Sequence, residues 1–133
     1  MTRPTGWPER LAEYIESRRD TPFEYGKHDC CHFAGGAVVA VTGIDYMAGY
    51  SYTSELGAAK LIKSAGTLDT LVSRALGEPI HPSQAGRGDV VIADLDNGST
   101  VGVCLGEQCA FASDEGGLTF RPRMMLRAAW RIG

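Results

Sequence analysis

Residues 25–33 have the sequence YGKHDCCHF, which places two cysteines and two of the chain's three histidines directly after a glycine turn. Asp29 is a good N-cap, and the residues after it predict a helix over residues 30–42 that ends at Gly43. A thiol at a helix N-terminus with imidazole neighbours has a lowered pKa, and the thiolate is its reactive form. The stretch therefore makes Cys30 a candidate nucleophile.

The predicted helix is rich in small residues, which are Ala34, Gly35, Gly36, Ala37 and Ala40. Small residues allow another backbone to approach a helix closely. We therefore interpret this helix as a buried central one and not as a surface helix.

The rest of the chain separates into a helical half and a strand half. Apolar residues at helical spacing, with capping residues and terminal glycines, predict helices over residues 8–19, 54–65 and 67–76. After Pro79, short β-branched runs between glycine turns predict strands over residues 88–93, 100–105, 109–112, 118–120 and 128–132. Helices followed by strands predict an α+β fold, with N-terminal helices packed on a C-terminal antiparallel sheet in a single domain, residues 1–133.

The composition is that of an ordinary globular domain, with 133 residues, 44% apolar residues, 22% charged residues and a net charge of -3. The negative charge gives no general attraction to nucleic acid or to an anionic membrane, so we expect no nucleic-acid partner. The longest apolar stretch, around residues 37–41, is too short to span a bilayer, and the first residues lack the apolar region of a secretory signal. We expect the chain to be made and folded in a cytoplasm, where its cysteines remain free thiols.

Several motifs, taken in order, resemble those of one enzyme family. Residues 25–30, at the head of a small-residue helix, resemble the D-C-S-G-F nucleophile motif of the NlpC/P60 cysteine peptidases. The sequence GDVV at residues 88–91 is similar to that family's G-D-L-V strand, and STVGVCLG at residues 99–106 is similar to its H-V-G-I-Y-L-G strand. The chain also resembles the small NlpC/P60-like proteins of tailed phages and prophages, in a W-x-x-R-L helix at residues 7–11 and an A-W-R strand at residues 129–131.

The resemblance implies a papain-like NlpC/P60 core, in which a cysteine at a helix N-terminus faces a histidine on the sheet. A polar residue on the next strand orients that histidine, and active members cleave amide bonds in peptidoglycan stem peptides through an acyl-enzyme. In this sequence Cys30 takes the nucleophile position and Thr100 falls where the catalytic histidine belongs. The orienting residue would lie near Ala110 or Ala112, and neither side chain can orient an imidazole.

No residue replaces the missing histidine in an obvious way. Threonine does not titrate near neutral pH, so Thr100 can neither take the thiol proton nor protonate the leaving amine. Residues 87–133 contain no histidine, and a carboxylate beside a thiol would raise the thiol's pKa. His28 lies two residues before Cys30 and could approach the sulfur from the turn, whereas His32 lies about 200° further round the helix and faces away.

The sequence predicts neither a cofactor nor a metal site. The adjacent Cys30 and Cys31 do not fit the usual C-x2–4-C spacing of metal ligands. Cys31, Cys104 and Cys109 are expected to behave as small core hydrophobes. The aromatic loop at residues 46–52 either lines a groove or packs on the chain's own core.

Two classes of function remain open. The first is a degenerate peptidase of a phage or prophage tail tip, with a structural or assembly role and tail-tip proteins as partners, and the threonine at position 100 favours it. The second is an active thiol amidase that cleaves peptidoglycan stem peptides with Cys30 as nucleophile, and the retained Asp29 and Cys30, with His28 nearby, favour it. Either class implies the cytoplasm of a bacterial host during assembly and the virion tail afterwards.

Overall fold

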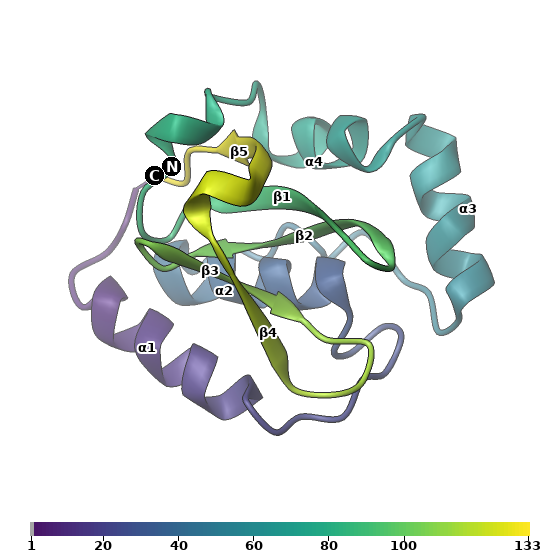
Figure 1. Cartoon of the computed structure of the whole chain (residues 1–133), viewed down its shortest axis with the longest axis horizontal. Helices are drawn as coiled ribbons and strands as arrows, with labels where there is room; N and C mark the ends of the chain where they lie inside the picture. Colours follow the sequence, from purple (N-terminus) through teal and green to yellow (C-terminus); the bar gives the residue numbers. More distant parts are fainter. Residues whose placement is uncertain (1) are drawn as a thin grey trace.

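The computed structural model describes residues 2–133, which form four helices followed by a five-stranded sheet (Figure 1). The helices are α1 (Trp7–Arg18), α2 (Cys30–Thr42), α3 (Glu55–Ala65) and α4 (Leu68–Leu76). The strands are β1 (Val90–Leu95), β2 (Gly98–Cys104), β3 (Gln108–Ala112), β4 (Leu118–Pro122) and β5 (Leu126–Trp130), with short 3-10 segments η1 (Pro82–Gln84) and η2 (Arg123–Met125). The predicted α+β class is confirmed, and the predicted helices and strands are all present with their ends shifted by at most two residues.

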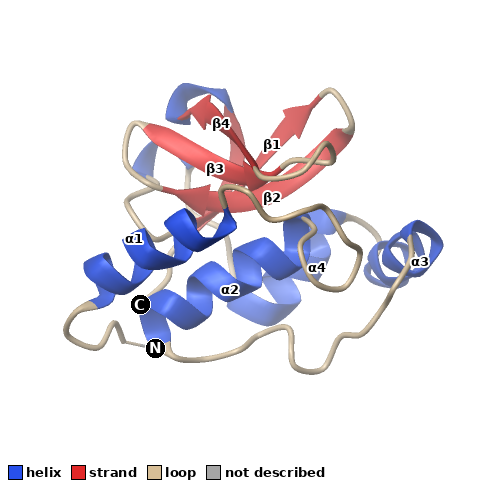
Figure 2. Ribbon diagram, turned by 90° about the horizontal axis from the view of Figure 1, so that it is seen from below, coloured by secondary structure: helices blue, strands red, loops and turns tan. Residues whose placement is uncertain are grey.

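The sheet has the order β4-β3-β2-β1-β5, and every neighbouring pair is antiparallel. Helices α1 and α2 lie together against one face of it (Figure 2). Because successive side chains of a strand alternate between the two faces, the strands divide the core into two clusters. Val90 and Val101 belong to the cluster beneath the helices, whereas Val91, Ala93 and Phe111 belong to a smaller cluster on the opposite face.

Helix α2 is the central helix of the fold, as predicted. It begins at Cys30 because Asp29 is extended and its carboxylate accepts the backbone N–H of His32, and it ends at Gly43, which adopts the left-handed conformation. The helix packs against α1, β2 and β3. At its closest contact with α1, Gly36 faces the Tyr14 hydroxyl, and there is no room for a side chain at that position.

Helix α3 stands at one end of the molecule, away from the centre of the sheet (Figures 1 and 2). Ser54 caps its N-terminus, and Gly66 follows its last residue. The helix contributes a single buried residue, Ala65, and its main packing partner is α4. It is therefore held by less buried surface than α2.

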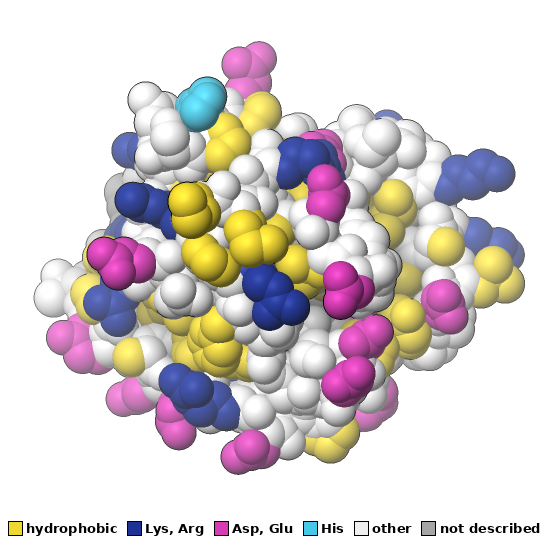
Figure 3. Space-filling view, in the orientation of Figure 1, with side chains coloured by type: hydrophobic (Ala, Val, Ile, Leu, Met, Phe, Trp, Pro, Cys, Tyr) yellow, Lys and Arg dark blue, Asp and Glu magenta, His cyan; other side chains and the backbone are white. Residues whose placement is uncertain are grey.

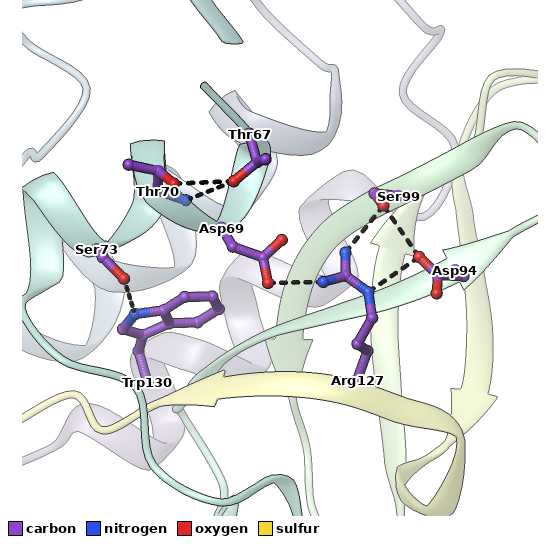
Figure 4. Close-up of polar contacts among 8 residues, drawn as sticks. All are labelled: Thr67, Asp69, Thr70, Ser73, Asp94, Ser99, Arg127 and Trp130. Atoms are coloured by element: carbon purple, nitrogen blue, oxygen red, sulfur yellow. Dashed lines mark hydrogen bonds and ion pairs between the residues drawn. The ribbon is translucent and has the colours of Figure 1, made fainter. Parts of the chain in front are cut away.

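Arg127 of β5 ties α4 to the sheet (Figure 4). Its guanidinium lies 2.6 Å from the carboxylate of Asp69 on α4 and 3.1 Å from that of Asp94 on β1, and it also donates to the hydroxyl of Ser99 on β2. One side chain thus joins four elements at the edge of the molecule next to the β1–β2 turn.

Candidate functional site

Cys30 is the first residue of α2, and its thiol lies against the sheet. The sulfur is 4.0 Å from the sulfur of Cys31 and is hydrogen-bonded by the backbone of Val101 on β2. The N-terminal end of a helix carries a partial positive charge, which favours a thiolate at this position. Position 101 directly follows the threonine that stands in place of the expected histidine, so the structure brings the two halves of the predicted site together.

The surroundings of Cys30 lower the pKa of its thiol below the ordinary value of 9.0. The hydrogen bond from the Cys31 thiol is the largest cause, and the Val101 backbone acts in the same direction, whereas burial and the negative charge of Asp29 oppose them. The hydrogen bond with Cys30, burial, and the negative charges of Cys30 and Asp29 raise the pKa of Cys31. Cys30 is therefore the more reactive thiol of the adjacent pair.

Asp29 is buried and acts as the organising residue of the turn. Its Oδ2 accepts the backbone N–H of Gly26 at 2.7 Å, and its Oδ1 accepts that of His32 at 2.8 Å. The His32 imidazole lies 3.0 Å from Oδ1, and Tyr52 hydrogen-bonds to the same carboxylate. The carboxylate is thus shared among four partners, which accounts for its burial without a catalytic role.

A cavity of about 510 Å³ opens beside Cys30. Its sheet-side wall comes from Thr100 and Ala112, the positions where the resemblance places the histidine and, as one of two candidates, its orienting residue. The opposite wall is the apolar face of α3, and the remaining walls carry Phe23, Tyr25, Asp29, Cys31, Tyr52, Asn97, Ser99 and Asp114.

Thr100 is buried, and its hydroxyl is hydrogen-bonded within the β1–β2 turn. Oγ1 donates to the carbonyl of Gly98 at 3.0 Å, and the side-chain amide oxygen of Asn97 lies 3.5 Å away. A hydroxyl engaged in this way can neither accept nor supply the proton that cysteine catalysis moves. The position of the expected general base therefore holds a residue without that capacity.

The hydrogen bonds of the histidine rings are made to groups other than the Cys30 sulfur. Nε2 of the buried His28 lies 2.9 Å from the carbonyl of Gly117, and its ring packs edge-on against Phe33. His32 is bound to Asp29 as described, and Nδ1 of the exposed His81 bonds the hydroxyl of Ser83. Within residues 2–133, none of the three histidines lines the cavity.

Carboxylates dominate the charge of the cavity. Asp29, Glu55 and Asp114 line it, whereas the part of its lining that the structure describes includes no lysine or arginine. The neighbouring hollow shares Asp114 and adds Asp96 and Glu115, with Arg121 as its cation. Figure 3 shows acidic side chains gathered over the β1–β2 and β3–β4 turns that border this region. Such a rim attracts cationic groups.

Sequence reasoning identified part of this lining and missed the rest. The aromatic loop at residues 46–52 contributes to two cavities. Tyr52 lines the Cys30 cavity, whereas Met47 and Tyr50 line a smaller apolar cavity between α2, α4 and the sheet. In the sequence, Asn97 stands only in the Asp96–Gly98 turn and Glu55 only at the start of a predicted helix, and neither position signals a site. Their contribution depends on tertiary packing, which brings three distant segments to the cysteine.

Across residues 2–133 no group of three or more His, Cys, Asp or Glu side chains could hold a metal ion. The same part of the chain includes no helix that could cross a membrane.

A family model described as "Domain of unknown function (DUF6950)" matches residues 2–132. Among curated proteins, none matches the chain.

Proposed function

The chain belongs to the DUF6950 family, and from the geometry of its site we propose that it is a degenerate cysteine peptidase with a papain-like, NlpC/P60-like core and a binding role. The observation that carries this proposal is the cavity itself. It keeps Cys30 at the helix N-terminus, but Thr100 replaces the general base and the imidazoles are bonded elsewhere. A cleft of this kind binds a peptide but does not cleave it.

The charge of the cleft indicates what it binds. The apolar face of α3 forms one wall, and the carboxylates of Glu55 and Asp114 lie at the rim. A peptide segment with a lysine or arginine side chain matches this combination. In the setting that the resemblance implies, such a segment belongs to a phage tail-tip protein, and the role is one of assembly.

Binding of a short lysine-containing peptide, compared with the same peptide acetylated at the lysine, tests the proposal. We expect the acetylated peptide to bind more weakly, and Glu55→Gln and Asp114→Asn to weaken binding of the unmodified peptide by about two- to fivefold each, the range of exposed charge pairs. Glu9→Gln, on the exposed side of α1, is the matched control and should change nothing. Equal affinity for both peptides contradicts the proposed ligand class.

The lowered pKa of Cys30 supports a second candidate, an active thiol amidase acting on peptidoglycan stem peptides. Incubation of the purified protein with muropeptides, followed by mass spectrometry, separates the two. The binding role predicts no cleavage by the wild type and unchanged peptide binding by Cys30→Ala. Cleavage that is lost in Cys30→Ala would establish the amidase.

A further inference from the structure

Cys104 and Cys109 form a second cysteine pair on the face of the sheet opposite the helices. Both are fully buried, and they belong to the cluster that also contains Val91, Ala93 and Phe111. They stand directly across from each other, Cys104 at the end of β2 and Cys109 near the start of β3. The site described above uses neither of them.

The backbone hydrogen bonds fix the geometry of this cross-strand pair. Cys104 directs its N–H to the carbonyl of Asp89 and its own carbonyl to the N–H of Gly88, both on the β1 side. The bond to β3 is made one residue later, where the N–H of Leu105 donates to the carbonyl of Gln108 at 2.8 Å. Cys104 and Cys109 are therefore a non-hydrogen-bonded pair, in which the Cα atoms of an antiparallel ladder approach to about 4.5 Å. That separation lies within the range that a disulfide spans.

The two thiols are chemically unequal. In the resting pair the Cys104 thiol donates to the carbonyl of Gly106 at 3.3 Å. The neighbouring Cys109 thiol, with a smaller effect of the positive charge of Arg123, lowers the pKa of Cys104 to about 7 against the opposing effect of burial. The hydrogen bond with Cys104 and burial raise the pKa of Cys109. A thiolate next to a thiol is the combination from which a disulfide forms, because the thiolate reacts first and the thiol then resolves the product.

From this arrangement we propose that Cys104 and Cys109 are a redox-active dithiol, which a peroxide converts to a reversible cross-strand disulfide. The Cys104 thiolate attacks one peroxide oxygen, the O–O bond breaks, and hydroxide leaves as Cys104 becomes a sulfenic acid. The Cys109 sulfur then attacks the Cys104 sulfur, the S–S bond forms, and the hydroxyl group leaves as water with the Cys109 proton. In total, two thiols and one hydrogen peroxide give one disulfide and two waters.

The oxidant reaches the pair through the turn that joins the strands. Glu107 and Gln108 are exposed and Leu105 is half-buried, so opening of this short turn uncovers both sulfurs without unfolding of the sheet. In the disulfide form the turn is closed covalently, and its opening is suppressed.

Peptide mapping tests the proposal on the wild-type protein. Trypsin places Cys104 and Cys109 together on residues 88–123, because it does not cut between Arg121 and Pro122, and Cys30 and Cys31 together on residues 28–60, so each pair is measured separately. After treatment with hydrogen peroxide and alkylation under denaturing conditions, we expect residues 88–123 to take up no alkyl group and to be lighter by about 2 Da, the two hydrogens lost in a disulfide. A glutamyl endopeptidase cuts after Glu107 and Glu115, and the two fragments that carry the cysteines, residues 88–107 and 108–115, should stay joined until dithiothreitol separates them.

Variants and amide exchange complete the test. Cys104→Ala should keep its one thiol on residues 88–123 alkylatable after mild oxidation, whereas Cys109→Ala should stop at a Cys104 sulfenic acid, which dithiothreitol returns to a thiol. The Leu105 amide should exchange more slowly in oxidised wild type than in reduced. The proposal is overturned if residues 88–123 of the wild type keep two alkylatable thiols, gain about 32 Da as a sulfinic acid, or link to residues 28–60. These outcomes do not depend on whether the Cys30 cleft binds or cleaves a peptide.

Discussion

Asp29 holds His32 by two groups at once, the backbone N–H at 2.8 Å and the imidazole Nδ1 at 3.0 Å from the same carboxylate oxygen. The pairing keeps the imidazole on the loop side of the helix, where its ring meets Tyr52 edge-on. A histidine two residues from the cysteine is thereby used to build the turn and not to activate the thiol. The retained aspartate and the bound histidine are parts of the same local structure.

Asp29→Asn should make Cys30 alkylate faster at neutral pH. Asparagine still caps a helix, but it removes the negative charge that raises the pKa of Cys30. Alkylation rates at pH 7, followed by mass spectrometry of residues 28–60, measure the effect. Ser54→Ala removes the cap of α3 and should lower the free energy of unfolding by about 1 kcal/mol without changing the rate at Cys30. Slower alkylation of Asp29→Asn would mean that the carboxylate activates the thiol.

Cys31→Ala should move the pH profile of Cys30 alkylation upward. The Cys31 thiol is the largest cause of the lowered pKa of Cys30, so its removal shifts the midpoint towards or above the ordinary 9.0. The rate at pH 7 falls accordingly, since it follows the thiolate fraction. Rates measured from pH 6 to 10 give the midpoint. An unchanged midpoint would mean that the helix terminus and the Val101 backbone, and not Cys31, lower the pKa of Cys30.

Arg127→Lys should reduce stability modestly and in a pH-dependent way. Arg127 is partly exposed, so we expect a loss of about 0.5–1 kcal/mol in the free energy of unfolding, measured by urea titration. Ser99 and Arg127 lower the pKa of Asp94 below its ordinary 3.8. Its contribution is therefore complete above that value and is lost as the pH falls through the lower folded pKa. Asp94→Asn should flatten this acidic part of the stability curve, and an unaltered slope would contradict the assignment.

Gly36→Ala should destabilise the packing of α1 on α2. A methyl group at position 36 collides with the Tyr14 ring and hydroxyl, which donates to the Phe33 carbonyl at 2.8 Å, so the ring or helix α1 must move. Overpacking of this kind costs about 1–3 kcal/mol in thermal or urea unfolding. Gly49→Ala is the matched control, because nothing lies within reach of a methyl group there. Equal stability of the two variants would show that α1 can shift without cost.

The elements with local signals were predicted closely. Both ends of α2 match because an aspartate cap and a left-handed glycine define them, and both are readable from neighbouring residues. Strands β1 and β2 are shifted by up to two residues, since pairing between strands, such as Ala93 with Thr100, decides where a ladder begins. Sheet register depends on partners that no single segment contains.

The candidate site was predictable only in part for the same reason. The helix start predicts Cys30 as a site residue, and the strand motif at residues 99–106 predicts Thr100. The structure places both residues at one cavity. The position of His28 was not predictable, because the carbonyl that binds it belongs to Gly117, 89 residues later in the chain. The acidic rim at Glu55 and Asp114 likewise arises where two distant segments meet.

Helix α3, which forms the apolar wall of the Cys30 cleft, rests mainly on α4 and buries only Ala65. It joins the main core through Ala65, with Leu61 and Ile62 partly buried against it, so the width of the cleft is set by an element with few core contacts. A displacement of this helix would widen the cleft at the loss of few buried contacts, so occupants of different size would fit the same site. Selectivity in such a cleft comes from the opposite side, where the cysteine, the sheet and the carboxylate of Asp29 lie, because α2 and the sheet are packed into the main core more extensively than α3.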